Sequence, residues 1–561
     1  MPSSPASLPR LPKSPQQKVG FVFSWRKLWA FTGPGWLMSL AYLDPGNLEA
    51  DLQQGAYTNL QLVWVLWWST CIGLVLQEMA ARLGCVTGKD LAQVSREHFA
   101  PWQSLVLYVN MELAIIGSDI QEVIGSAIAL KLLFGLPLYA GCLITGLDTF
   151  TFLAVHYLGV RYLEALICFL IGTMAVCFFV VWGDAGTNGK QLATGWVAPL
   201  LPGYAIQQAV GTMGAVIMPH NLYLHSGLVL SRKLDRSDST AVAEANAYNL
   251  IESSAALLCS FFINLAVVAA FAAYFFNTDC AAQGLACLPC ATVNDNDGTC
   301  SSSHGDACST SSSGSGIAAN VGPHLATCDS IGLERAGDAL QRAAPNGAVA
   351  LVIWGVGLLA AGQAATMTAT FAGQIVMDGF LNIKLPQWQR VLLTRVVALG
   401  PALAVSVATG SNTALFNSIN EWLNILQSIQ LPFAMLPILK LTSMTSIMGE
   451  DFRTQGKQAG LVASLACVVL FVNFYLLGNF LADPTAPVPH EPWLYVLCAA
   501  WAVAYLSFLT SLFWAEAKAW VAELGGRRQQ HRGGKVPSEE PPEPLDQETN
   551  ANPLHAPSTL P

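Results

Sequence analysis

Long, mostly apolar runs follow one another along the chain from about residue 29 to residue 519. A helix needs about 20 such residues to cross a hydrocarbon core of about 30 Å. The apolar positions are continuous rather than alternating, which favours helices over the strands of a membrane barrel. The pattern predicts twelve membrane spans, at residues 29–56, 61–83, 104–134, 138–158, 162–183, 204–230, 247–276, 347–378, 388–409, 414–442, 458–481 and 493–519.

The composition agrees with this pattern. Of 561 residues, 53% are hydrophobic and 11% are charged, whereas a soluble domain carries about 25% charged residues. The net charge of −9 offers no basic surface for nucleic acid. The chain shows no nucleotide-binding loop and no HExxH zinc motif, so we expect neither an enzymatic activity nor a resident cofactor. The sequence indicates an integral, multi-pass protein of the lipid bilayer.

Basic residues predict how the chain is oriented, because Lys and Arg concentrate on the cytosolic side of a membrane. With a cytosolic N-terminus, four of the 27 basic residues fall outside and one lies within a span, which leaves 22 on the cytosolic side. An even number of spans then puts both termini in the cytosol, as disordered tails over residues 1–23 and 521–561, flanking a transmembrane domain over 24–520. The exceptions are Lys131, Lys190, Arg335 and Arg342 outside and Arg395 within a span.

One long insertion, residues 277–346, is predicted to lie outside the cytosol. It holds six cysteines, and disulfides persist in such compartments. Six thiols allow 15 pairings, which the sequence leaves open. A metal site at Cys287-x-x-Cys290 is the weaker alternative to disulfides, and the run Ser309–Gly316 is expected to be mobile. The six are Cys280, Cys287, Cys290, Cys300, Cys308 and Cys328.

Two predicted spans carry a proline-containing polar tetrapeptide near their middle. These are Asp44-Pro-Gly-Asn47 in the first span and Met218-Pro-His-Asn221 in the sixth. Proline lacks a backbone N–H and collides with the preceding turn, so each span should unwind there. The carbonyls of Ala41 and Ala215, just upstream, then lose their helical partners. Open backbone at this depth is tolerated only where it lines a cavity or binds a ligand.

The two interruptions occupy matching places in the chain. Each opens a block of five spans, residues 29–183 and 204–442, with two extra helices over 458–519. Paired interruptions at corresponding positions of two halves are typical of inverted-repeat transporters with a site at the membrane midplane. An ordinary proline kink is the alternative for each. The pattern favours an all-α polytopic protein with a site between its first and sixth spans.

The side chains at the interruptions suggest the ligand. Asp44 offers an anionic oxygen, Asn47 a neutral oxygen and Met218 a thioether. Oxygen ligands alone suit Mg²⁺ or Ca²⁺, whereas an added sulfur shifts the preference towards Mn²⁺, Fe²⁺ and later first-row ions. Packing is the alternative role for the methionine.

With these motifs the sequence resembles the NRAMP family of proton-coupled divalent-metal transporters, from about Ser24 to Trp520. The resemblance implies a LeuT-like fold with two inverted five-helix repeats. It also implies that the metal is bound by Asp44, Asn47, Met218 and the carbonyls of Ala41 and Ala215. Besides the two tetrapeptides, the matching motifs are Gly88-Lys-Asp90, the stretch 117–125 in the third span and the stretch 362–381 between the eighth and ninth spans.

Ionisable groups inside spans are costly and are therefore functional candidates. Glu112, Asp119 and Glu122 in the third span share one helix face, since Asp119 lies about 20° from Glu112 and Glu122 about 60° further round. Arg395 is the expected counter-charge, and the resemblance places these residues on a proton route. His220 is either a proton-exchanging group or a structural hydrogen-bonder.

The tenth span adds amides at Asn424 and Gln427, which either join helices or complete a metal shell. We therefore expect a secondary transporter of Mn²⁺ or Fe²⁺, coupled to H⁺ and directed towards the cytosol, in a plasma, endosomal or vacuolar membrane. The alternatives are an amino-acid carrier coupled to Na⁺ or protons, a metal-gated channel, and a membrane metal sensor or receptor that does not transport. The sequence predicts no oligomeric state.

Overall fold

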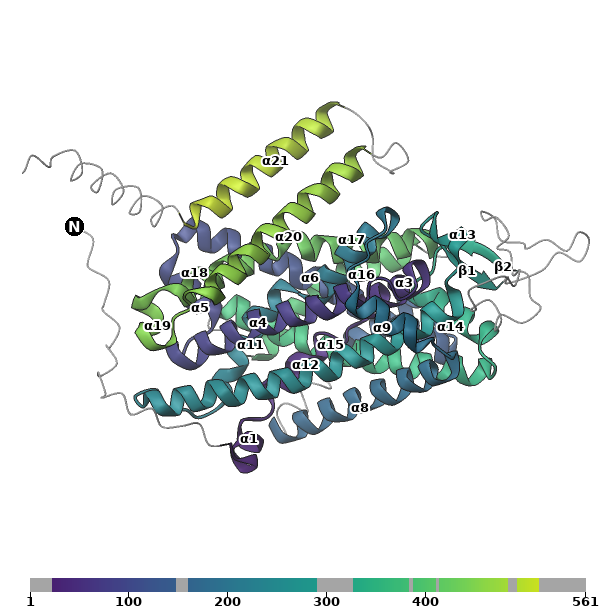
Figure 1. Cartoon of the computed structure of the whole chain (residues 1–561). Helices are drawn as coiled ribbons and strands as arrows, with labels where there is room; N and C mark the ends of the chain where they lie inside the picture. Colours follow the sequence, from purple (N-terminus) through teal and green to yellow (C-terminus); the bar gives the residue numbers. More distant parts are fainter. Residues whose placement is uncertain are drawn as a thin grey trace, which may run out of the picture. The chain divides into compact units, whose positions relative to one another are not determined.

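The computed structural model describes residues 23–147, 160–289, 326–382, 387–409, 413–482 and 492–513. The helices up to Leu512 contact one another and belong to one unit (Figure 1). Several predictions lie outside the described residues. They are the two tails, the C-terminal part of the fourth span, Ser309–Gly316 and the cysteines Cys290, Cys300 and Cys308.

Within the described residues, seven helical segments have the length and apolar character to cross a bilayer. A shorter apolar helix, Leu138–Leu147, begins where the fourth span is predicted. The seven belong to α4 (Val63–Thr87), α6 (Pro101–Phe134), α8 (Val160–Ala185), α12 (Ser239–Phe275), α15 (Gly347–Leu381), the α17–α18 pair (Thr413–Gln430 and Pro432–Ser443) and α20 (Lys457–Ala482).

The first and sixth spans are each divided into two short helices. The first consists of α2 (Pro34–Leu40) and α3 (Pro45–Thr58), and the sixth of α10 (Ile206–Val216) and α11 (Pro219–Leu228). In both spans the second helix begins at the proline of the tetrapeptide, where the missing N–H does no harm because it would be unpaired anyway. The chain is thus interrupted where the prolines predict it.

Two further helices, α16 (Gln387–Thr409) and α21 (Pro492–Ser511), lie at the predicted ninth and twelfth spans, and the others are shorter. Two 3₁₀ turns, Gly203–Ala205 and Val229–Ser231, flank the sixth span. Apart from the predicted insertion, the α-helices still to be named are α1 (Trp25–Phe31), α5 (Leu91–His98), α9 (Gly189–Val197) and α19 (Thr445–Phe452).

The predicted starts of two spans were wrong, whereas the tenth span is continuous as predicted. The first span begins at Pro34 rather than residue 29, because Gly33 adopts a φ of 144° that ends the preceding α1. The tenth span continues from Ile419 to Ser443, because Leu431 keeps helical φ and ψ of −53° and −41° although Pro432 removes one backbone hydrogen bond. The seventh span begins at Ser239, where the Asp238 side chain accepts the Thr240 N–H, eight residues before the predicted start.

The predicted extracytoplasmic insertion is partly structured. It contains α13 (Thr278–Ala281), the antiparallel strands β1 (Ala286–Pro289) and β2 (Ala326–Asp329), and α14 (Leu333–Ala343). In Figure 1 these elements lie at one end of the helix bundle, which we call the outer end; α5 and α19 lie at the other, which we call the inner end.

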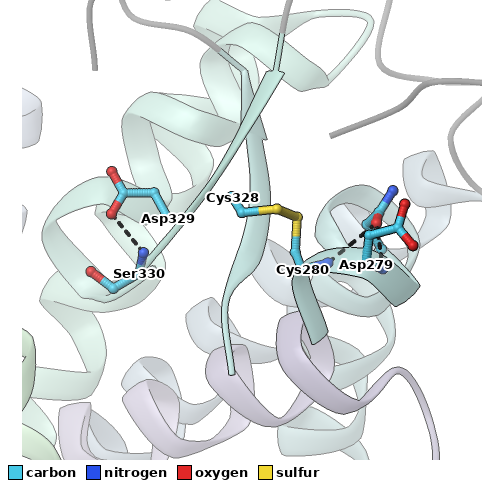
Figure 2. Close-up of a disulfide and its surroundings, with 6 residues drawn as sticks. Asp279, Cys280, Cys328, Asp329 and Ser330 are labelled. Carbon is cyan, nitrogen blue, oxygen red and sulfur yellow. Dashed lines mark hydrogen bonds between the residues drawn. A yellow bond between two sulfur atoms is a disulfide. The ribbon is translucent and has the colours of Figure 1, made fainter. Parts of the chain in front are cut away.

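Disulfides in this insertion are confirmed. Cys280 is bonded to Cys328, which fastens α13 to β2 (Figure 2). Cys287 is also disulfide-bonded. The alternative of a metal site at Cys287-x-x-Cys290 is therefore wrong, because a half-cystine has no thiolate to offer.

The insertion is attached to the outer half of the first span. Glu49 of α3 accepts the backbone N–H of Leu333 at 2.6 Å, so this buried carboxylate satisfies the first turn of α14. The Tyr57 hydroxyl contacts the backbone N–H and carbonyl of Ile331 at 3.0 and 3.2 Å. Lys131 of α6 forms an ion pair with Glu334. The outer elements therefore hold α3 and α6 together.

The inner half of the first span is attached to a different partner. Glu252 of α12 accepts the backbone N–H groups of Gly33 and Gly35 at 2.5 and 3.1 Å. Arg232 donates to the carbonyl of Thr32. The start of α2 is thus held by α12 rather than by the outer elements that hold α3.

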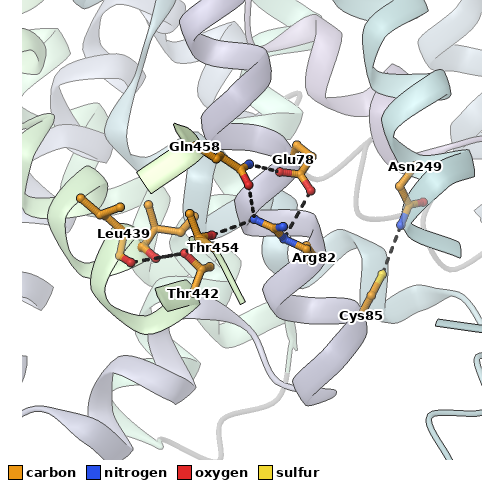
Figure 3. A network of polar contacts seen from close by, with 9 residues as sticks. Glu78, Arg82, Cys85, Asn249, Leu439, Thr442, Thr454 and Gln458 are labelled. Carbon is orange, nitrogen blue, oxygen red and sulfur yellow. Dashed lines mark hydrogen bonds and ion pairs between the residues drawn. The ribbon is translucent and has the colours of Figure 1, made fainter. Parts of the chain in front are cut away.

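A polar network near the inner end joins α4 to the last part of the bundle (Figure 3). Arg82 contacts Glu78 at 3.3 Å and donates to Thr454 at 2.8 Å. Gln458 donates to Glu78 at 3.0 Å, and Asn249 of α12 approaches the Cys85 sulfur at 3.2 Å. These contacts fix α4 between α12 and the α19–α20 connection.

Candidate metal site

The interruption of the first span is built around Asp44. Its Oδ1 accepts the backbone N–H of Asn47 at 2.9 Å and the Asn47 side-chain amide at 2.6 Å, so Asp44 caps α3. Both side chains are buried. Among the described residues, Oδ2 of Asp44 and Oδ1 of Asn47 have no hydrogen-bond partner. Two oxygens, one of them anionic, are therefore left for a cation.

Backbone carbonyls at the interruptions add further oxygens. The residue four positions after Ala41 is Pro45, and the residue four positions after Ala215 is Pro219. Neither proline has an N–H, so both carbonyls lack the usual α-helical partner. The neighbouring carbonyl of Tyr42 is bound instead by the side-chain amide of Asn264 at 2.8 Å.

The interruption of the sixth span is built around Met218, which is buried and precedes α11. Its sulfur lies 4.0 Å from the hydroxyl oxygen of Ser118. His220 and Asn221 follow on the first turn of α11 and are also buried. Within the described part of the chain, Nδ1 of His220 and both polar atoms of the Asn221 side chain have no hydrogen-bond partner.

Two further elements each touch both interruptions. On α6, Ser118 contacts Met218, and Gln121, one turn later, lies so close to Gly46 that a Cβ there would be 2.7 Å from the glutamine oxygen. On α17, the Asn424 side chain donates to the Gly46 carbonyl at 3.2 Å. The backbone oxygen of the same asparagine lies 2.2 Å from where a Cβ at Gly214, one residue before Ala215, would be. The two interruptions therefore converge on the same turn of α6 and the same residue of α17.

The amides of the tenth span join helices in this structure. Gln121 donates to Asn424 Oδ1 at 2.9 Å, and Gln427 donates to Gln121 Oε1 at 3.1 Å. The Asn424 oxygen is thus engaged, and it would have to leave Gln121 to bind a metal. The side-chain oxygen of Gln427 has no partner among the described residues and remains available.

The acidic face of α6 approaches the site through Ser118. Glu122 is buried, and its Oε1 accepts the Ser118 hydroxyl at 2.8 Å. The same hydroxyl group contacts the Met218 sulfur, so one side chain separates a candidate metal ligand from a carboxylate. Asp119 is buried beside Glu122, and Glu112 is half-buried further along α6. Arg395 lies on α16, and its side chain falls outside the described part of the structure.

Sequence reasoning missed three residues that shape the site. Ser118 and Gln121 belong to the stretch 117–125 that carried the family resemblance, but roles were predicted only for the carboxylates Asp119 and Glu122 of this stretch. Asn264 is an isolated amide in the apolar seventh span, and such a buried amide needs a hydrogen-bond partner. The need for a hydrogen-bond partner could have marked Asn264 as a structural residue from the sequence, although it does not identify the partner as the Tyr42 carbonyl.

The donor set around the interruptions is mixed. In the described residues no group of three or more His, Cys, Asp and Glu side chains is placed to hold a metal ion. A cation at this site would be bound by one carboxylate, amide and backbone oxygens and a thioether. Oxygen with a soft sulfur suits first-row divalent ions better than it suits Mg²⁺ or Ca²⁺.

Comparison with known proteins shows to which protein family the chain belongs. The family model described as natural resistance-associated macrophage protein-like matches residues 35–288 and 317–479. The chain therefore belongs to the Nramp family.

Similar proteins are named as metal transporters. The chain is 43% identical over 490 residues to Metal transporter Nramp3 of Arabidopsis thaliana, covering 87% of each chain. It is 43% identical over 475 residues to the Metal transporter nramp1 homolog of Dictyostelium discoideum, covering 84% of this chain and 78% of that one. Among solved structures, the Eremococcus coleocola manganese transporter in complex with an aromatic bis-isothiourea substituted compound matches with a TM-score of 0.71 at 27% identity, covering 90% of this chain and 98% of that chain. The predicted family is confirmed, and the solved structure supports the predicted LeuT-like transporter fold.

Proposed function

We propose that this protein carries a divalent transition-metal ion, Mn²⁺ or Fe²⁺, together with protons towards the cytosol by alternating access. The observation that carries the proposal is the convergence of the two interruptions. Asp44 and Met218 belong to segments that both contact the Ser118–Gln121 turn and Asn424. A hard anionic oxygen and a soft sulfur are thereby offered to one ion.

The relatives support a metal ion as the substrate, because they are named as metal transporters and one as a manganese transporter. The thioether argues against Na⁺ or an amino-acid carboxylate, since neither gains from a sulfur ligand. A single carboxylate leaves a bound divalent ion with excess positive charge, which favours release of a nearby proton.

The attachments of the broken spans support alternating access. The outer half of the first span, α3, is held by α14 through Glu49, whereas the inner half, α2, is held by α12 through Glu252. The inner half of the sixth span, α11, bonds to α5 because Ser226 accepts the Leu91 N–H at 2.8 Å. The helical hydrogen bonding is broken at each interruption, so each is a place about which the two halves of a span can move, as at a hinge, while α12 packs against both halves of the first span.

The acidic face of α6 supports proton coupling. The Ser118 hydroxyl links the surroundings of Met218 to Glu122. A proton displaced when a cation binds at Asp44 would have carboxylates within reach at Glu122 and Asp119. Arg395 remains the proposed counter-charge. We also propose that both termini face the cytosol, since the basic residues predict a cytosolic N-terminus and the disulfides of the insertion suit an extracytoplasmic compartment.

The test is uptake of radioactive Mn²⁺ into proteoliposomes that contain the full chain, with and without an inward proton gradient. We expect saturable uptake that is faster with the gradient and is accompanied by acidification of the vesicle interior. Uptake that does not saturate would indicate a channel. Gradient-driven uptake of an amino acid, with no metal uptake, would replace the metal carrier by an amino-acid carrier.

A further inference from the structure

A second carboxylate lies on the same stripe of α3 as the candidate metal ligands. Asp51 follows Asp44 by seven residues, which is about two helical turns and about 10 Å along the axis. Positions seven apart differ by only about 20° around a helix, so both side chains leave α3 on one side. Asn47 stands between them, one turn before Asp51.

Asp51 is buried without any visible compensation. Its side chain is 1% exposed, and in the described residues neither carboxylate oxygen has a hydrogen-bond partner. No described Lys or Arg forms an ion pair with it. A buried carboxylate without donors is strongly unfavourable unless a cation or a proton neutralises it. The oxygen of Asn47, equally buried, also has no partner there.

The stripe faces the outer half of the sixth span. Thr212 of α10 donates to the side-chain oxygen of Gln54, one turn beyond Asp51, at 3.0 Å. The amide nitrogen of Gln54 has no partner among the residues described. Further along α3, Tyr57 contacts Ile331 of the outer elements. The unpartnered polar atoms of α3 therefore extend from the interruption towards the outer end, as far as Gln54, which contacts α10.

We propose that Asp51 forms a second binding site for a divalent cation, an outer station from which the ion passes, by way of the side-chain oxygen of Asn47, to Asp44. The identity of the ion rests on the proposed function. Because the donors of the outer station are all oxygens, it binds Ca²⁺ and Mg²⁺ as readily as Mn²⁺. Discrimination among metals then begins only at Met218.

The electrostatics favour a bound divalent cation at either carboxylate over an empty pair of carboxylates. Asp44 and Asp51 carry like charges at a separation where repulsion in a poorly solvated interior is substantial. A divalent ion at either carboxylate relieves this repulsion. The competing explanation is that Asp51 is a structural group that stays protonated and never binds a metal.

Equilibrium binding of Mn²⁺ distinguishes an outer cation site at Asp51 from a protonated structural group. The full chain is studied in lipid nanodiscs, and free Mn²⁺ is followed by electron paramagnetic resonance. We expect two ions per chain, the second bound at least about tenfold more weakly, a difference of about 1.4 kcal/mol. Asp51→Asn should bind one ion with the tighter affinity, which also shows that the variant is folded. Asp44→Ala should bind one ion with the weaker affinity, and Ca²⁺ should displace that ion readily.

The matched control is Asp90→Asn, which neutralises a buried helix-capping aspartate near the inner end and should leave two ions bound. One ion per chain in the parent, unchanged in Asp51→Asn, would overturn the outer station and identify Asp51 as a protonated structural group. Retention of the tighter ion by Asp44→Ala would instead contradict the proposed function. In that case the loss of one bound Mn²⁺ ion in Asp51→Asn would still support the outer station, independently of the proposed function.

Discussion

The two interrupted spans differ in how many of the polar groups at the break have a hydrogen-bond partner within the protein. In the first, the Asp44 carboxylate caps α3 and Asn264 binds the carbonyl of Tyr42. In the sixth, Met218 makes no side-chain cap, and the Asn221 side chain has no hydrogen-bond partner among the described residues. The first interruption is thus held in place by its own residues and α12, and the sixth is held mainly by packing.

This difference suggests a division of labour. The first interruption supplies the negative charge and fixed oxygens, which determine whether a cation binds at all. The sixth supplies a polarisable sulfur, which determines which cation is preferred. Four substitutions would break or sharpen this comparison, and their expected effects decrease in the order given.

Asp44→Ala should have the largest effect. It removes the charged ligand and the cap of α3, so Mn²⁺ uptake by proteoliposomes should fall more than about 100-fold, beyond the loss caused by removing an outer-shell partner. Asp44→Asn is the matched control, because asparagine caps helices equally well but carries no charge. Uptake at the parental rate in Asp44→Ala would remove this residue from the site.

Met218→Ala should change selectivity more than affinity. Without the thioether, the preference for Mn²⁺ over Ca²⁺ in uptake competition should drop about tenfold, or about 1.4 kcal/mol. Met213→Ala, which truncates a methionine of α10 away from the interruption, should leave the preference unchanged. If Met218→Ala lowered Mn²⁺ affinity while keeping the preference, the sulfur would be a packing group.

Glu122→Gln should change the pH dependence of uptake rather than the binding of the metal ion. The amide keeps a hydrogen bond with Ser118 but cannot take up a proton, so Mn²⁺ uptake should lose most of its dependence on pH. The measurement is the initial uptake rate at several external pH values, together with vesicle acidification. Glu97→Gln, at an exposed ion pair with Lys89, serves as control. Identical pH profiles for Glu122→Gln and its parent would exclude the proposed route.

Asn264→Ala should have the smallest effect. It leaves the buried carbonyl of Tyr42 without its donor, which costs about 1–3 kcal/mol, so the midpoint of thermal unfolding in detergent should fall by a few degrees. Ser260→Ala, which removes a donor to the Ser39 carbonyl one turn earlier, is the matched control and should shift the midpoint less. An unchanged midpoint in Asn264→Ala would mean that the first interruption is not held by α12.

Local sequence determined the elements and the places where they break. Apolar runs give the spans because a bilayer admits only helices whose backbone is satisfied internally. Pro45 and Pro219 give the interruptions, and they free the carbonyls of Ala41 and Ala215, because a missing N–H acts on the residue four positions earlier whatever the rest of the chain does. Pro432 likewise removes one backbone hydrogen bond from the tenth span, but Leu431 keeps helical angles there and the span continues.

Only the tertiary structure decided which groups meet. The contacts of Gln121 with Gly46 and of Asn424 with both interrupted spans join residues that are far apart in the chain, so no local pattern contains them. The same holds for Glu49 with Leu333 and for the pairing of Cys280 with Cys328 among the possible partners. Helix periodicity fixes which face a side chain occupies, but the packing of helix against helix fixes what that face touches.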